Sequence, residues 1–119
     1  MEHLKRRVPI FGLSLRVYEK EGDFYGRQYP IDGGRLDILA IDDANNFYVI
    51  ELKKDGGYDD AYCQTKRYIQ WIKKNKATDA QKVVGIICLN SPTAKIIKQV
   101  QRDDEIRLIG YAISYTEIS

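Results

Sequence analysis

Alternating apolar and polar side chains predict strands in the first part of the chain. Over residues 13–19, leucine and valine occupy every second position, which is the pattern of a half-buried strand. A polar stretch then turns the chain, and residues 24–31 are expected to form a second extended segment. Turn-forming residues end this segment, namely Pro30, Asp32, Gly33 and Gly34.

Two strongly apolar runs follow, over residues 35–41 and 47–53, and a loop of five turn-prone residues, 42–46, separates them. This arrangement predicts a β-hairpin. Both alternating sets of positions are apolar in each run, so we expect the hairpin to be covered on both faces. A strand pair covered in this way belongs in the centre of a sheet.

Helical spacing begins in the second half of the chain. Residues 59–74 carry apolar side chains at helical intervals, with aspartates at the start and lysines at the end, as the helix dipole favours. The apolar run 82–89 is expected to be a buried strand, and the crossover before it makes it parallel to 47–53. A second helix is predicted from Ser91, as its N-cap, to about Arg102.

A last predicted strand over residues 106–115 completes the order βββ-α-β-α-β. This order indicates an α/β fold with a mixed central β-sheet flanked by helices. The 119 residues fit a single domain, with an ordinary globular balance of 30% charged and 44% hydrophobic residues. No apolar run approaches the ~18 residues of a membrane span, and no signal-peptide core follows the basic N-terminus. We therefore expect a cytoplasmic protein with no membrane partner.

The inventory of nucleophiles and metal ligands is short. His3 is the sole histidine, so a Ser-His-Asp triad, a Cys-His dyad and the common zinc sites all lack parts. Cys63 and Cys88 fall far apart in a predicted helix and a predicted strand, and we expect reduced, packed thiols. Any chemistry must therefore depend on carboxylates, lysines and amides.

The hairpin register brings such groups together. If Ile41 lies opposite Phe47, the pairing continues to Asp37 opposite Glu51, and Lys53 projects from the same face. Opposed carboxylates repel each other, and their burial costs free energy unless a cation lies between them. Mg²⁺ or Mn²⁺ would suit these oxygen ligands. The spacing leaves one alternative open, a salt bridge between Lys53 and either carboxylate at a sheet edge.

The helix that follows adds an amide to this group. Ala61, Gln64, Tyr68 and Ile72 form one stripe on a helical period, and we expect this stripe to face the sheet. A buried amide needs hydrogen-bond partners, and the carboxylates with their bound water or metal are the nearest candidates for Gln64. In the alternative interpretation, Gln64 caps a backbone group and Tyr68 only packs.

Together these residues resemble the PD-(D/E)xK nuclease superfamily. The signature consists of Asp37, the run Glu51-Leu52-Lys53, and a QxxxY element from Gln64 to Tyr68. A closer similarity, over roughly residues 13–115, is to the catalytic domain of the NucS (EndoMS) mismatch endonucleases. It rests on four runs, Tyr-Gly-Arg-Gln-Tyr-Pro at 25–30, Gly-Arg-Leu-Asp-Ile-Leu-Ala at 34–40, Tyr-Val-Ile-Glu-Leu-Lys at 48–53 and Tyr-Ile-Gln-Trp-Ile at 68–72.

This resemblance implies a restriction-endonuclease-like core and a metal-dependent endonuclease. The enzyme would hydrolyse phosphodiester bonds in DNA, with Mg²⁺ or Mn²⁺ as cofactor, in DNA repair or the processing of foreign DNA. Asp37 and Glu51 would be metal ligands, together with the backbone carbonyl of Leu52. The resemblance further implies that Lys53 orients or activates the attacking water and that Gln64 and Tyr68 support the site.

The chain departs from the family at its front. Family members open with a longer helix whose glutamate touches the metal site, and Glu2 is the positional match for that catalytic residue. The segment from Leu4 to Leu13 is shorter than in the family and contains Pro9, so we expect a shortened N-terminal helix. The alternative function is therefore a catalytically impaired DNA-binding or assembly module on the nuclease fold.

The distribution of charge bears on DNA binding. The net charge is only +2, but basic residues cluster at 5–7, 53–54, 66–67 and 73–76, apart from the acidic clusters at 19–23 and 103–105. This separation predicts a phosphate-tracking surface, with DNA contacts from Arg35, Lys54, Lys66 and Arg67. The residues at 73–76 have an alternative role at a helix C-terminus, and Arg35 could instead form a structural ion pair. A double-strand break would require two copies, most simply a C2 homodimer that uses the strand at 106–115.

Overall fold

In the part of the chain that the structure describes, the protein has a mixed α/β fold in which one seven-stranded sheet carries two helices. The structure is a computed structural model that describes residues 8–10, 13–53, 60–90 and 92–110. Its elements in chain order are β1 (Val8–Ile10), β2 (Leu13–Val17), β3 (Arg27–Ile31), β4 (Gly34–Ile41), β5 (Phe47–Lys53), α1 (Ala61–Asn75), β6 (Val83–Leu89), α2 (Ala94–Gln101) and β7 (Ile106–Gly110).

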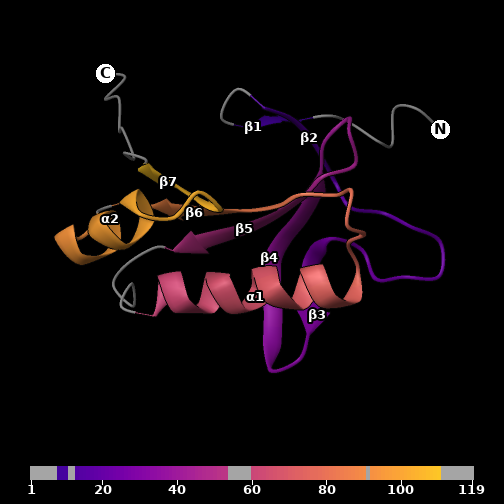
Figure 1. The fold of residues 1–119 in the computed structure, drawn as a ribbon. Coiled ribbons are helices and arrows are strands. Elements are labelled where there is room, and N and C mark those ends of the chain that lie inside the picture. Colours follow the sequence, from indigo (N-terminus) through magenta and orange to yellow (C-terminus); the bar gives the residue numbers. More distant parts are fainter. Residues whose placement is uncertain (1–7, 11–12, 54–59, 91, 111–119) are drawn as a thin grey trace, which may run out of the picture.

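The strands follow the order β1-β2-β4-β5-β6-β7, and β3 pairs with the first part of β4. The pairs from β1 to β5 are antiparallel, whereas β5, β6 and β7 are parallel. Helix α1 lies across the sheet, and α2 lies beside β7 near the free end of β5 (Figure 1). The predicted central hairpin and the parallel strand after the crossover are both confirmed.

The core has two parts, one on each face of the sheet. One cluster joins α1 and α2 to the sheet and includes Val49, Ile69, Ile87 and Ile96. The second cluster lies on the other face and consists of Leu15, Ala40, Tyr48, Ile50, Ile86 and Cys88. Alternate residues of β5 enter different clusters, as expected for a strand with period two. The prediction that the hairpin is covered on both faces is confirmed.

Helix α1 approaches β6 closely because a glycine lies beneath it. A Cβ atom on Gly85 would lie 2.7 Å from Cγ2 of Thr65 and 2.9 Å from Cδ1 of Ile69. The buried residues of α1 are Ala61, Thr65, Tyr68, Ile69 and Ile72. The predicted stripe is therefore largely confirmed, but Thr65 takes the fully buried polar position and Gln64 is half-buried.

The hairpin register agrees with the prediction. Ile41 pairs with Phe47 and Leu39 with Val49. The loop between the strands contains Asn45 in the left-handed region, with φ 65°, and Asp42 accepts hydrogen bonds from the backbone N–H groups of Ala44 and Asn46. Five residues can therefore connect β4 to β5 without distorting the ladder.

Several predicted boundaries were wrong. Helix α2 begins after Thr93, whose Oγ1 accepts a hydrogen bond from the Ile96 N–H, so Thr93 is the N-cap in place of Ser91. The predicted strand 13–19 is β2 and ends at Val17. The predicted strand 24–31 is β3 and begins at Arg27, because residues 18–26 form a hydrogen-bonded loop.

The N-terminal part contains a strand that was not expected from the sequence. Val8–Ile10 forms β1 and pairs with β2, although Pro9 lies in its middle. A proline fits an edge strand, where one N–H has no ladder partner. Glu2 and the predicted shortened helix around it lie outside the described residues, as does the end of the predicted strand after Gly110.

Neither helix in the described ranges has the length and apolar composition needed to cross a membrane.

Candidate active site

The candidate site lies where β4 and β5 separate. Their regular pairing ends at Ile38 opposite Ile50, one pair before Asp37 and Glu51. Beyond it, the backbone N–H of Asp37 donates to Oε2 of Glu51 at 3.1 Å, and the backbone N–H of Leu52 donates to Oδ2 of Asp37 at 2.7 Å. Each carboxylate thus accepts a hydrogen bond from the opposite strand. The hairpin opens at this point, and both carboxylates are held in the gap.

Glu51 is an unusual residue for a sheet interior, because its exposed fraction is only 2%. Burial raises the pKa of Glu51 to about 7, and the charge of Asp37 contributes to the increase. The Asp37 N–H bond and the charge of Lys53 lower this pKa but do not offset burial. In the folded chain, Glu51 is therefore partly protonated near neutral pH, and a further positive charge beside it would favour its ionised form.

Lys53 projects from the same face as Glu51, as predicted. Its Nζ lies 3.9 Å from Oε1 of Glu51 and donates a shorter hydrogen bond, 2.8 Å, to Oε1 of Gln64. The salt bridge considered from sequence is therefore present but loose, and β5 is a central strand, not a sheet edge. The predicted partners of Gln64 were the carboxylates, whereas the structure gives it the amine of Lys53.

Tyr68 lies on α1, one turn after Gln64. It is buried, and its hydroxyl oxygen lies 2.9 Å from the position that a Cβ on Gly34 would occupy, so a larger residue there would displace the Tyr68 side chain. The Cζ atom of Arg67 lies 5.5 Å from the centroid of the Tyr68 ring. Tyr68 therefore connects the start of β4 to the middle of α1, while Arg67 remains exposed.

The donor set fits a hard divalent cation. Oxygen atoms of Asp37 and Glu51 converge at the open end of the hairpin, and the carbonyl of Leu52 belongs to the same short segment. Such oxygen donors suit Mg²⁺ or Mn²⁺. The raised pKa of the buried Glu51 is the electrostatic sign of an uncompensated carboxylate. In the described ranges, no group of three or more His, Cys, Asp or Glu side chains gathers at one point.

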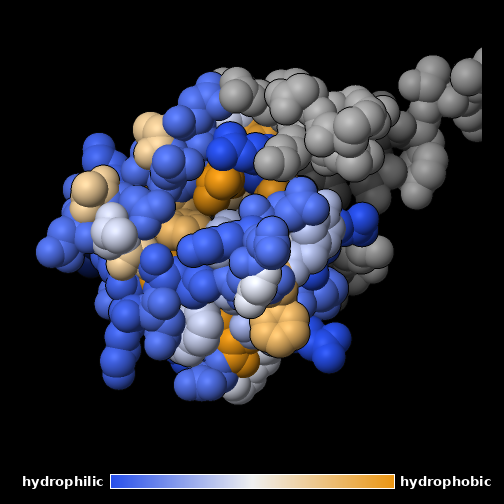
Figure 2. Space-filling model, turned by 90° about the vertical axis from the view of Figure 1, so that its right-hand side faces the viewer, coloured by the Kyte–Doolittle hydropathy of each residue, from blue (hydrophilic) through white to orange (hydrophobic). Residues whose placement is uncertain are grey.

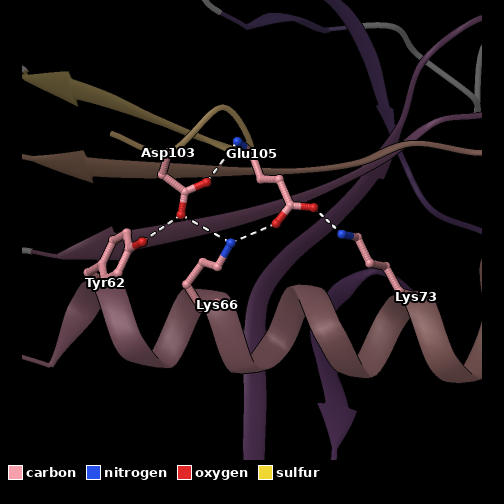
Figure 3. A network of polar contacts seen from close by, with 5 residues as sticks. All are labelled: Tyr62, Lys66, Lys73, Asp103 and Glu105. Carbon is pink, nitrogen blue, oxygen red and sulfur yellow. Dashed lines mark hydrogen bonds and ion pairs between the residues drawn. The ribbon is translucent and has the colours of Figure 1, made fainter. Parts of the chain in front are cut away.

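Lys66, which the sequence predicts to contact DNA, belongs to an ion-pair network within the protein (Figure 3). Its Nζ lies 3.0 Å from Oδ2 of Asp103 and 2.6 Å from Oε1 of Glu105. Tyr62 donates to Asp103 at 2.6 Å, and Lys73 pairs with Glu105. Hydrogen bonds from Lys66 and Lys73 lower the pKa of Glu105. This network fastens α1 to the segment between α2 and β7.

A second network pairs another lysine of the predicted basic clusters with an acidic side chain. Lys76 pairs with Asp23, which also accepts hydrogen bonds from the hydroxyls of Tyr18, at 2.7 Å, and Tyr29, at 3.1 Å. The basic and acidic clusters that are separate in sequence are therefore joined in space. The expectation of segregated charge was wrong for Lys66, Lys73 and Lys76, because packing of α1 brings them to the acidic segments.

Of the other residues predicted to contact DNA, two are exposed and one lies outside the described residues. Arg35 is exposed on β4, two residues before Asp37, and Arg67 is exposed on α1. Lys54 lies outside the described residues. Cys88 is buried as expected, whereas Cys63 is exposed on α1 and is not packed.

The opposite end of the sheet has a hollow that is not a candidate site. Seen from the right-hand side of Figure 1, the surface is mainly hydrophilic, with apolar side chains in its hollows (Figure 2). A cavity of about 470 Å³ is lined by Tyr18, Phe47, Lys76 and Gln81, among others. One of its polar lining residues, Gln81, donates a hydrogen bond to the carbonyl of Asn45 at 2.6 Å.

Four polar residues with a structural role were not predicted from the sequence, namely Tyr62, Thr65, Asp103 and Glu105. Oγ1 of Thr65 is buried without a hydrogen-bond partner. Tyr62 and Asp103 are 41 residues apart, so no local pattern could have paired them.

The chain is similar to known proteins in sequence and in structure. Residues 16–110 match the family described as the endonuclease NucS C-terminal domain. Endonuclease NucS of Methanocaldococcus jannaschii is 36% identical over 76 residues, which cover 61% of this chain and 28% of that protein. The crystal structure of a repair endonuclease from Pyrococcus abyssi has a TM-score of 0.58 at 26% identity, over 72% of this chain and 36% of that chain.

The structure of an EndoMS–dsDNA complex is similar to the same extent, with a TM-score of 0.57 and 26% identity, over 71% of this chain and 34% of that one. The chain thus spans about a third or less of the length of these relatives. The family match, in contrast, includes both strands of the candidate site and both helices. The chain belongs to the endonuclease NucS C-terminal domain family.

Proposed function

We propose that this chain is a metal-dependent endodeoxyribonuclease domain of the PD-(D/E)xK type, with a restriction-endonuclease-like core. Its reaction is hydrolysis of phosphodiester bonds in DNA, in repair or in the processing of foreign DNA. The observation that carries the proposal is the convergence of Asp37, Glu51, Lys53 and Gln64 where β4 and β5 separate. Membership of the NucS family and the similarity to an EndoMS–dsDNA complex support the choice of DNA as substrate.

Asp37, Glu51 and the Leu52 carbonyl would hold Mg²⁺ or Mn²⁺. When bound, such an ion polarises the scissile phosphate and lowers the pKa of a water molecule. The carboxylates are fixed for this task before binding, since backbone N–H groups of the opposite strand hold both. Preorganised ligands lose less conformational entropy when the ion binds.

Lys53 supplies positive charge to the reacting phosphate. The hydrogen bond to Gln64 sets the direction of its amine, and Tyr68 packs one turn further along the same helix face. Because the amine is oriented in advance, it stabilises negative charge that develops in the transition state at little reorganisation cost. The amide of Gln64 acts through Lys53 and is a positioning residue.

Nicking of supercoiled plasmid with Mn²⁺ or Mg²⁺ tests the proposal. We expect the wild-type chain to nick the plasmid. In Asp37→Asn and in Lys53→Met, the rate of nicking should decrease at least 100-fold, which is roughly the effect of removing one electrostatic contact to the transition state. The matched controls are Asp79→Asn and Lys82→Met, because both residues are exposed on the segment that enters β6 at the far end of the sheet. Equal nicking by Asp37→Asn and Asp79→Asn would refute the assignment.

The same experiment, with a DNA-binding measurement beside it, distinguishes the nuclease from the alternative function. Retention of DNA binding without nicking, by wild-type and Asp37→Asn chains alike, identifies a catalytically impaired DNA-binding or assembly module. The homodimer through the strand at 106–115 remains a separate prediction, because the described part of that strand, Ile106–Gly110, pairs only with β6.

A further inference from the structure

Arg67 lies at the rim of the candidate active site. It follows Gln64 by three residues on α1, and side chains with this spacing are neighbours on a helix surface, with Cβ atoms about 5–6 Å apart. Gln64 in turn accepts the hydrogen bond from Lys53. Arg67 therefore brings a second positive charge beside the groups proposed to act on the scissile phosphate.

The guanidinium of Arg67 rests on a fixed aromatic ring. Its Cζ lies 5.5 Å from the centroid of Tyr68, which is buried and packed against the backbone of Gly34. A cation above an aromatic face is attracted to the ring, so Tyr68 limits the orientations of the arginine side chain. The residue itself is exposed, which leaves the N–H donors in contact with solvent.

The adjacent Lys66 provides a contrast within one turn of helix. Lys66 is neutralised by Asp103 and Glu105. In the described ranges, Arg67 makes no hydrogen bond or ion pair, and its one interaction is with the Tyr68 ring. Of these two neighbouring basic residues, Lys66 forms ion pairs within the protein, whereas Arg67 is exposed to solvent beside the site.

We propose that Arg67 binds a backbone phosphate of the DNA strand adjacent to the phosphate at the carboxylates. A guanidinium presents a planar set of N–H donors that matches phosphate oxygens in a bidentate manner, which an ammonium cannot do. The contact fixes the register of the cut strand in the site without reading its sequence. This assignment rests on the proposed function for the identity of the ligand as DNA.

Salt-dependent DNA binding tests this assignment without any cleavage. Fluorescence anisotropy of a short labelled duplex is measured in EDTA over a series of salt concentrations, with wild type, Arg67→Met and Arg67→Lys. The slope of log K against log salt is negative, and loss of one phosphate contact in Arg67→Met should decrease its magnitude by about 0.9. Arg67→Lys should retain the wild-type slope but bind more weakly, because the charge remains and the planar fork is lost.

Two further variants make the result specific. Lys82→Met removes an exposed lysine at the far end of β6, and Lys66→Met removes the neutralised neighbour. Both should retain the wild-type slope, although Lys66→Met should lower the melting temperature. A wild-type slope in Arg67→Met, an equal decrease in Lys82→Met, or no DNA binding by the wild type would each overturn the assignment.

Failure of this inference is distinguishable from failure of the proposed function. If the slopes change as expected but no variant nicks plasmid, the phosphate contact stands and the nuclease proposal fails. If plasmid is nicked and Arg67→Met binds like wild type, the nuclease proposal stands and the phosphate contact fails.

Discussion

Replacement of Glu51 by glutamine should stabilise the metal-free protein, by an amount that depends on pH. Glutamine has nearly the shape of glutamate and retains an oxygen that accepts the Asp37 N–H, but it carries no charge. The folded chain raises the pKa of Glu51 to about 7 from an ordinary value of 4.5. Folding therefore favours the protonated form, and ionisation of Glu51 in the folded state costs stability.

The magnitude follows from this difference in pKa. Below pH ~4.5 the carboxyl is protonated in both states, and its full contribution to stability is present. As pH rises toward 7, the unfolded chain releases the proton first, so the contribution is lost. Each unit of pKa corresponds to about 1.4 kcal/mol, so the loss above pH ~8 is about 3 kcal/mol. At pH ~6 it is about 2 kcal/mol, and at pH ~5 it is about 1 kcal/mol by the same relation.

Urea denaturation followed by circular dichroism, in EDTA at several pH values, measures this effect. We expect Glu51→Gln to exceed the wild type by about 3 kcal/mol above pH ~8 and to converge with it near pH ~4.5. Asp79→Asn is the matched control, since its exposed carboxylate should change stability by less than about 0.5 kcal/mol. A stability difference that does not vary with pH, or a wild type more stable than Glu51→Gln above pH ~8, would refute the reasoning.

Two further predictions concern the scaffold. Gly26→Ala should cost about 3 kcal/mol or more, because the new Cβ would lie 2.2 Å from the backbone oxygen of Leu39; urea denaturation checks this, with Gly110→Ala as a control whose Cβ would lie 3.9 Å from its nearest neighbour, an ordinary contact. Thr65→Val should raise stability by about 1 kcal/mol, because it removes a buried hydroxyl that has no hydrogen-bond partner, and a lower melting temperature in calorimetry would contradict this reading.

Much of the scaffold around the site could be predicted from the sequence. The apolar runs at 35–41 and 47–53 and the loop between them determine a central hairpin, and a side-chain period of two then sets its register. That register brings Asp37, Glu51 and Lys53 to one end of the hairpin, where the structure has them. These features were accessible because each depends on local backbone preference and on which face of a strand is buried.

The chemical state of the site was decided by the tertiary structure. The hairpin opens before Asp37 and Glu51 would pair regularly, so their carboxylates accept backbone N–H groups from opposite strands. The raised pKa of Glu51 results from burial, which depends on the packing of α1 on the sheet. For the same reason, the partner of Gln64 is Lys53, a choice that spacing along the helix could not reveal.

Ion pairs between residues far apart in the chain could not be predicted from the sequence and were decided by the tertiary structure. The sequence by itself determined the strands from β2 onward, the two helices and the carboxylate pair, because hydrophobic periodicity reports local geometry and burial. Only the tertiary structure decided which basic residues face outward. Lys66 and Glu105 are 39 residues apart, and Lys76 and Asp23 are 53 apart, so their pairing required α1 to be packed in place. Because of its position on α1, Arg67 forms no such pair within the described ranges, and it remains exposed, as does Arg35 on β4.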